Sequence, residues 1–127
     1  MPLVRIATLQ GRPADFGRKI GDIVYRAMVE TINVPPADNF QVITEHDRDH
    51  LVYDPGYLGI SRTDGVVFIQ ITLNEGRSVE RKKLLYRTLA ERLHHELGIR
   101  MEDVFVSLVE VKKENWSFGN GVAQYAE

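Results

Sequence analysis

The second half of this 127-residue chain repeats the first half at an offset of 65 residues. The apolar stripes of two expected helices align in that register, with Ile20 on Leu85 and Val24 on Leu89. Identical residues also align without a gap: Ile6 with Ile71, Gly11 with Gly76, Arg12 with Arg77, Asp38 with Asp103, Phe40 with Phe105, and Glu45 with Glu110. The repeat indicates one small βαβ unit used twice, because each half carries the same pattern of elements.

The first half predicts a strand, a helix and a second strand. Apolar and β-branched residues indicate strands over residues 3–9 and 40–44. Between them, helical spacing of apolar residues predicts a helix over residues 13–33, with Pro13 at its first position. Residues 45–64 have no regular period and are expected to form a hairpin or an excursion.

The second half predicts the same order of elements. The nearly continuous apolar run 66–73 is typical of a central strand that is covered on both faces. A helix is expected to start after Ser78 as the N-cap and to end at Gly98, and a fourth strand follows over residues 104–111. The charged residues 80–83 are interpreted as an exposed first helical turn that serves solubility.

Two βαβ units predict an α/β (α+β) fold with one four-stranded mixed sheet and both helices on one face. We expect one domain over residues 1–127, with pseudo-repeats about 1–62 and 63–127. One unit alone cannot bury its sheet face, so the two units must share a sheet. The opposite sheet face then needs a cover, and self-association is the expected one.

Composition excludes several classes of function. The net charge of −2 and the pI of about 6.1 argue against nucleic acid or an anionic membrane as a partner. Because the chain has no cysteine, disulfides, thiol nucleophiles and zinc-thiolate sites are excluded. No stretch approaches the ~18 apolar residues of a membrane span, and we expect a cytoplasmic protein. His46 and His50 lie beside aspartates, but this short, irregular and charged segment does not favour a metal site.

Pro2 is the first candidate functional residue. Removal of Met1 by methionine aminopeptidase would expose Pro2 as a secondary amine, whereas retention of Met1 would leave an amide without basicity. An α-amino group titrates near ~8, and an apolar pocket or a neighbouring cation eases loss of its proton, so such a terminus can serve as a base. The alternative is a proline that merely precedes a strand, where it need not donate a ladder hydrogen bond.

Several short motifs occur together in one order along the whole chain. They are Pro2-Leu3, Asp38 before Phe40-Gln41, the segment from Gly59 to Asp64, the Gly76-Arg77 turn followed by Glu80 and Lys82, and Trp116-Ser117-Phe118-Gly119 with Gly121 and Ala123-Gln124 beyond. In this order and spacing they resemble the tautomerase superfamily, and more closely its malonate semialdehyde decarboxylase branch.

The resemblance implies a homotrimer with a tautomerase-like β-α-β fold and no metal or organic cofactor. It implies that Pro2 is the catalytic amine, that Arg77 binds the substrate carboxylate, and that Asp38 activates or orients a water or polarises the substrate. Arginine suits a carboxylate because its planar fork donates two parallel hydrogen bonds and stays charged. Some decarboxylases of this branch carry two arginines separated by one residue after the third strand, whereas Glu75 takes the first of these places here.

Each of the remaining site candidates has a structural alternative. Asp38 follows two prolines at a strand entrance, where an aspartate often caps a turn, and its repeat mate Asp103 lies where no site is expected. Trp116 and Phe118 either form an apolar, substrate-binding wall beside Pro2 or make contacts within the expected trimer.

The expected function is therefore that of a cofactor-independent enzyme acting on a small carboxylate-bearing oxo acid. A neutral Pro2 would move a proton beside a carbonyl and give keto-enol tautomerisation. A protonated Pro2 would polarise a 3-oxo acid for hydration or decarboxylation. The alternatives are a non-catalytic, ferredoxin-like module that binds small ligands, for which a dimer is expected, and a tautomerase scaffold that has lost turnover.

Overall fold

The computed structural model describes residues 2–126, so the expectation that Met1 is removed lies outside the described residues. The elements are β1 (Leu3–Leu9), α1 (Phe16–Ile32), β2 (Phe40–His46), η1 (Tyr57–Gly59), β3 (Val67–Asn74), α2 (Val79–Leu97), η2 (Met101–Asp103), β4 (Val104–Val111) and η3 (Lys113–Asn115). Moved by 65 positions, β1, α1 and β2 fall on β3, α2 and β4 to within two residues. The predicted duplication of a βαβ unit is confirmed.

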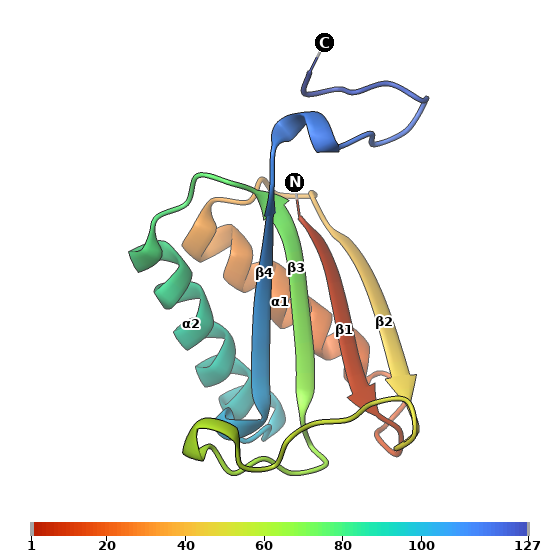
Figure 1. Ribbon diagram of the computed structural model, residues 1–127, viewed down its shortest axis with the longest axis vertical. Helices are drawn as coiled ribbons and strands as arrows, with labels where there is room; N and C mark the ends of the chain where they lie inside the picture. Colours follow the sequence, from red (N-terminus) through yellow and green to blue (C-terminus); the bar gives the residue numbers. More distant parts are fainter. Residues whose placement is uncertain (1, 127) are drawn as a thin grey trace.

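The four strands form one mixed sheet in the order β2-β1-β3-β4. Each unit contributes a parallel pair, β1 with β2 and β3 with β4, and the two units join through the antiparallel pair β1 and β3. Both helices lie on the same face of the sheet (Figure 1). This is the predicted fold class, and it follows from two βαβ units sharing one sheet.

The core lies between the sheet and the helices. Alternate residues of β1 and β3, such as Val4 and Ile71, are fully buried there against the helical stripes that include Ile20 and Leu89. The expectation that the third strand is covered on both faces is not met within one chain. The other face of the sheet stays open, because both helices pack on the same side. Gln70 of β3 is exposed there, and Phe105 of the neighbouring β4 is 47% exposed.

The helix ends follow local chemistry, with one correction. α1 begins at Phe16 rather than at residue 13, because Pro13 to Asp15 form a turn in which the Phe16 N–H donates to the Pro13 carbonyl at 3.0 Å. For α2, the predicted N-cap is confirmed, since the Ser78 hydroxyl accepts from the Arg81 N–H at 3.2 Å. The predicted end of α2 is confirmed as well, with Gly98 left-handed at φ 68°.

The segment between β2 and β3 is an excursion, so the hairpin alternative was wrong. The Arg62 guanidinium stabilises this segment, which has no strand pairing. Its Nη1 donates to the carbonyls of Asp54, Tyr57 and Ile60 at 3.1 to 3.4 Å. Because these carbonyls already have a donor, the segment needs no ladder. In the described part of the chain, no helix combines the length and the apolar composition that crossing a membrane requires.

Candidate active site

One edge of the sheet collects the candidate residues. Because β1 and β2 are parallel and start together, with Leu3 paired to Phe40, Pro2 and Asp38 lie at the same edge. β3 runs antiparallel to β1, with Leu3 paired to Thr72, so β3 and its parallel neighbour β4 both end there (Figure 1). The strand order therefore brings Arg77, which follows β3, and the tail after β4 to the edge at which the chain begins.

Pro2 lies in an apolar hollow at this edge. The hollow has a volume of about 220 Å³ and is lined by Pro2, Leu3, Phe40, Trp116, Ser117 and Phe118. Pro2 itself is buried, and the Trp116 and Phe118 rings stack with their centroids 5.4 Å apart. Both aromatic residues named from the sequence thus share a hollow with Pro2, as the wall interpretation requires.

Arg77 lies on the helix side of the same edge. Its Nε donates to the Ile32 carbonyl at the end of α1, and its Nη1 donates to the Asn74 carbonyl at the end of β3, both at 3.1 Å. The side chain is thereby pinned, and the guanidinium keeps further N–H donors for an anion. Within the described residues, neither Arg77 nor Asp38 lines the hollow that contains Pro2.

Asp38 is held at the start of β2 by a strained turn. Asp38 is only 8% exposed, and it directly follows Ala37, whose backbone is left-handed at φ 69°. A left-handed alanine is unfavourable, and the Tyr25 hydroxyl supports it by accepting the Ala37 N–H at 2.9 Å. Tyr25 was not anticipated from the sequence, where it is one more residue of a helical pattern.

Other residues at this edge escaped prediction as well. The charged run 80–83 does more than serve solubility: Arg81 Nη1 donates to the Thr31 carbonyl at 3.0 Å, and Lys82 Nζ lies 2.7 Å from Glu110 Oε1. Arg81 and Arg77 therefore both cap the end of α1, where carbonyls lack helical partners. Only the position of Arg81 one helical turn after Arg77 hinted at this in the sequence.

Two family models of tautomerase enzymes match the chain, one over residues 38–119 and the other over residues 2–59. The first covers more than half of the chain. The chain belongs to the tautomerase family. In line with this, it is 46% identical to the probable tautomerase YusQ of Bacillus subtilis (strain 168) over 127 residues, which is 100% of both chains.

Solved structures support the same branch of the superfamily that the motifs indicated. FG41 malonate semialdehyde decarboxylase inhibited by 3-bromopropiolate is 35% identical, with a TM-score of 0.89 over 97% of this chain and 93% of that one. A second malonate semialdehyde decarboxylase, solved as wild type, as a mutant with its first proline changed to alanine, and in an inactivated form, is 32% identical, with a TM-score of 0.88 over 97% and 95%. The predicted resemblance to this branch is confirmed.

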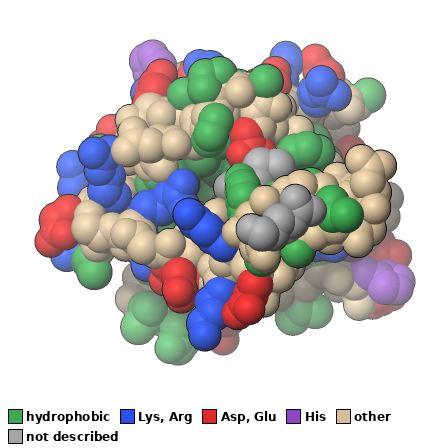
Figure 2. Space-filling model, turned by 90° about the horizontal axis from the view of Figure 1, so that it is seen from above, with side chains coloured by type: hydrophobic (Ala, Val, Ile, Leu, Met, Phe, Trp, Pro, Cys, Tyr) green, Lys and Arg blue, Asp and Glu red, His purple; other side chains and the backbone are tan. Residues whose placement is uncertain are grey.

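Cations and carboxylates lie together at this end of the molecule. Seen from the end at which the chain begins, Lys and Arg side chains lie among hydrophobic side chains, with Asp and Glu side chains next to them (Figure 2). The hydrogen bond from Lys82 holds the pKa of the Glu110 carboxyl below its usual range, and the nearby charge of Arg77 acts in the same direction. The edge thus offers an anion both positive charge and free N–H donors.

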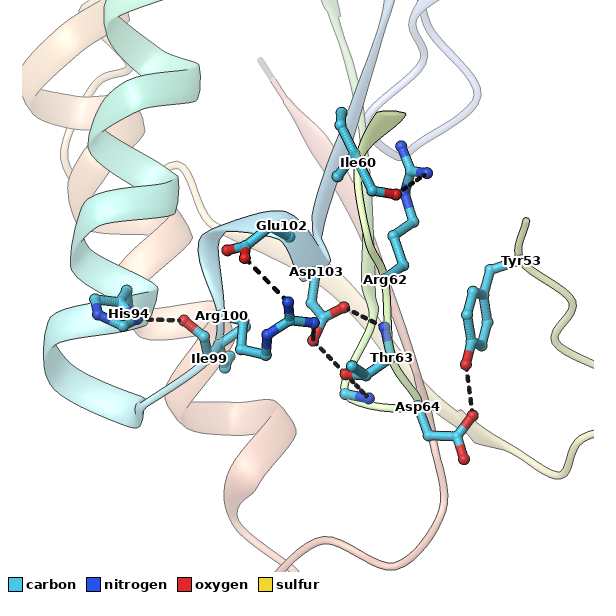
Figure 3. A network of polar contacts seen from close by, with 11 residues as sticks. Tyr53, Ile60, Arg62, Thr63, Asp64, His94, Ile99, Arg100, Glu102 and Asp103 are labelled. Carbon is cyan, nitrogen blue, oxygen red and sulfur yellow. Dashed lines mark hydrogen bonds and ion pairs between the residues drawn. The ribbon is translucent and has the colours of Figure 1, made fainter. Parts of the chain in front are cut away.

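The repeat mates of the candidate residues have structural roles at the opposite end. Asp103, the mate of Asp38, is 1% exposed; its carboxylate accepts the Thr63 N–H at 2.8 Å and the Thr63 hydroxyl at 2.6 Å (Figure 3). Arg12, the mate of Arg77, lies over the Phe16 ring at 4.7 Å. Across residues 2–126, no group of three His, Asp or Glu side chains is arranged to hold a metal ion.

Proposed function

We propose that this protein is a cofactor-independent enzyme in which Pro2, freed by removal of Met1, acts as an acid or base on a small carboxylate-bearing oxo acid. The observation that carries this proposal is the apolar hollow that contains Pro2, Trp116 and Phe118, at the edge to which β3 brings Arg77. The names of the similar proteins, which are tautomerases and malonate semialdehyde decarboxylases, support it.

Arg77 is proposed to hold the substrate carboxylate. Its two bonds to backbone carbonyls orient the guanidinium, so little side-chain freedom remains to be lost when an anion binds. Asp38 is proposed to orient a water or to polarise the substrate. The bond from the Ala37 N–H to the Tyr25 hydroxyl supports the backbone turn directly before Asp38, which suits a group that must meet a substrate at a defined angle.

With a 3-oxo acid such as malonate semialdehyde, protonated Pro2 would donate a hydrogen bond to the carbonyl oxygen. The bond between the carboxylate carbon and C2 then breaks, carbon dioxide leaves, and the electron pair forms an enolate. Pro2 stabilises the charge on the enolate oxygen, and a proton taken up at C2 gives acetaldehyde. The apolar wall of Trp116 and Phe118 favours this step, because loss of carbon dioxide disperses charge and is easier away from water.

Keto-enol tautomerisation is a second candidate, and the name of the relative YusQ, a probable tautomerase, favours it. Neutral Pro2 would remove a proton from the carbon beside the carbonyl and return it to the other end of the enolate, with no other change in the substrate. The same amine serves both reactions, and its protonation state selects between them. A nitrogen NMR titration of the Pro2 amine measures that state directly.

A homotrimer is proposed as the working assembly. The open face of the sheet carries apolar side chains, including Phe105 at 47% and Val42 at 39% exposure, around a hollow of about 580 Å³. Neighbouring copies would cover this face. Sedimentation of the purified protein separates a trimer from the dimer that a ferredoxin-like binding module would form. A trimer without turnover on any oxo acid would instead indicate an inert scaffold.

Three variants test the role of Pro2. Pro2→Ala, and insertion of one alanine ahead of Pro2, should each lower kcat by about 10²- to 10⁴-fold, the second because it turns the amine into an amide while keeping the ring. Pro13→Ala is the matched control, because this exposed proline lies in the turn before α1. Intact mass spectrometry must show loss of Met1 from the wild type. Full activity of the inserted variant would rule out the mechanism.

A further inference from the structure

Asn74 joins the two sides of the candidate active site. It is the last residue of β3, and its carbonyl accepts from Arg77 Nη1 at 3.1 Å on the helix side of the sheet edge. Its side-chain Oδ1 accepts from the Trp116 indole N–H at 2.8 Å. Successive side chains of a strand point to opposite faces, and that of Asn74 points with those of Phe68 and Gln70 to the open face. One residue thus holds both the cation and the aromatic wall.

The bond to Asn74 is a side-chain hydrogen bond that ties the tail to the sheet. Among the side-chain hydrogen bonds of the described tail residues 116–126, this one reaches β3, whereas Gln124 bonds only to Phe118 and Gly119 within the tail. The rings of Phe118 and Tyr125 pack edge to face, again inside the tail. The tail is therefore tied together by contacts of its own, and the indole bond is a polar contact that fixes it beside Pro2, next to the apolar lining of Leu3 and Phe40.

Asparagine meets two demands here that neither leucine nor aspartate meets together. An indole N–H donates but cannot accept, so a half-buried tryptophan needs an acceptor. Leucine would leave that N–H without a partner. Aspartate would supply the oxygen, but it would also put a negative charge on the residue whose backbone carbonyl accepts from Arg77, and that charge would oppose binding of a substrate carboxylate. The neutral amide satisfies Trp116 and leaves the charge of Arg77 to the substrate.

We propose that Asn74 is a positioning residue that seats the Trp116 wall over Pro2 without neutralising Arg77. This inference rests on the proposed function for its kinetic consequences only. The seating of Trp116 is a property of the folded protein and is measurable without turnover, because Trp116 is the one tryptophan in the sequence and reports on its own surroundings.

Two substitutions separate the two demands. In Asn74→Leu the backbone carbonyl that receives Arg77 is kept, so KM should stay within about twofold. The unseated Trp116 should show red-shifted emission and stronger acrylamide quenching, and kcat should fall by about 10- to 100-fold because a displaced wall admits water. In Asn74→Asp the acceptor is kept, so emission should stay native while KM rises by about tenfold or more.

The control is Asn115→Leu, an exposed asparagine next to Trp116, which should change neither emission nor kinetics. Native emission and native kcat in Asn74→Leu would overturn the proposal, and so would equal effects of the Leu and Asp substitutions. If the wild type turns over no oxo acid, the proposed function fails on its own. The fluorescence emission of the two variants, and their affinity for malonate measured by calorimetry, then still decide the role of Asn74.

Discussion

Replacing Arg77 by methionine should weaken both the fold and carboxylate binding. Methionine keeps an apolar stem of similar length but loses the hydrogen bonds to the Ile32 and Asn74 carbonyls. A net hydrogen bond contributes about 1 kcal/mol, and a cation at a helix C-terminus adds about 0.5 kcal/mol, so the free energy of unfolding should fall by about 2 to 2.5 kcal/mol. KM for an oxo acid should rise by about 100-fold, because the charged fork is gone.

The repeat supplies the matched control for this experiment. Arg12→Met changes the same residue type at the equivalent position of the first unit, where Arg12 lies over the Phe16 ring at 4.7 Å. Loss of that contact should cost about 0.5 to 1 kcal/mol and leave KM unchanged. Urea unfolding at one fixed protein concentration gives the stabilities, because a self-associating protein unfolds in a concentration-dependent way. Equal losses of stability and an unchanged KM in both variants would refute the roles assigned to Arg77.

Three further predictions concern residues around the site and at the opposite end. Tyr25→Phe removes the acceptor of the Ala37 N–H, so it should lower the free energy of unfolding by about 1 kcal/mol and slow turnover about tenfold. Ala37→Gly suits the left-handed φ of 69°, so the free energy of unfolding should stay within about 1 kcal/mol of the wild type in thermal melts. Asp103→Ala, which removes two hydrogen bonds from a buried carboxylate, should lower stability by about 2 to 4 kcal/mol and leave carboxylate binding intact, as urea titration and calorimetry can check. Because Lys82 depresses the pKa of Glu110, this pair stabilises the fold at pH values above the ordinary pKa of a glutamate, and it loses its effect as the pH falls through the depressed pKa. The excess stability of the wild type over Glu110→Gln should therefore be present at pH 7 and vanish in acid. An excess that is independent of pH would contradict the assignment.

The elements themselves could be predicted because their causes are local. Alternation and helical spacing of apolar residues lie within a few neighbours, and so do the capping signals at Ser78 and Gly98, which the structure confirms. The repeat added the long-range part, since two βαβ units have few ways to share a sheet. The one poor boundary, at residue 13, lay where Pro13 suits a turn as well as a first helical position.

The contacts between distant segments could not be predicted. Nothing in the sequence says that Arg77 meets the Ile32 carbonyl or that Trp116 meets Asn74. Each depends on the strand order β2-β1-β3-β4, which brings the ends of β3 and β4 to the starts of β1 and β2. Hydrogen bonds of this kind are specific to geometry rather than to residue pattern, so many sequences with the same periodicity would make different ones.

The sequence by itself thus determined two similar strands, β1 and β3, and the proline that directly precedes the first of them. Tertiary structure decided what surrounds that proline. It placed Pro2 in a hollow with Trp116 and Phe118, and it placed the guanidinium of Arg77 on the helix side of the same edge. The physical reason is that apolar pattern acts through burial, which many arrangements satisfy, whereas a site needs groups at fixed distances, which only the packed chain supplies.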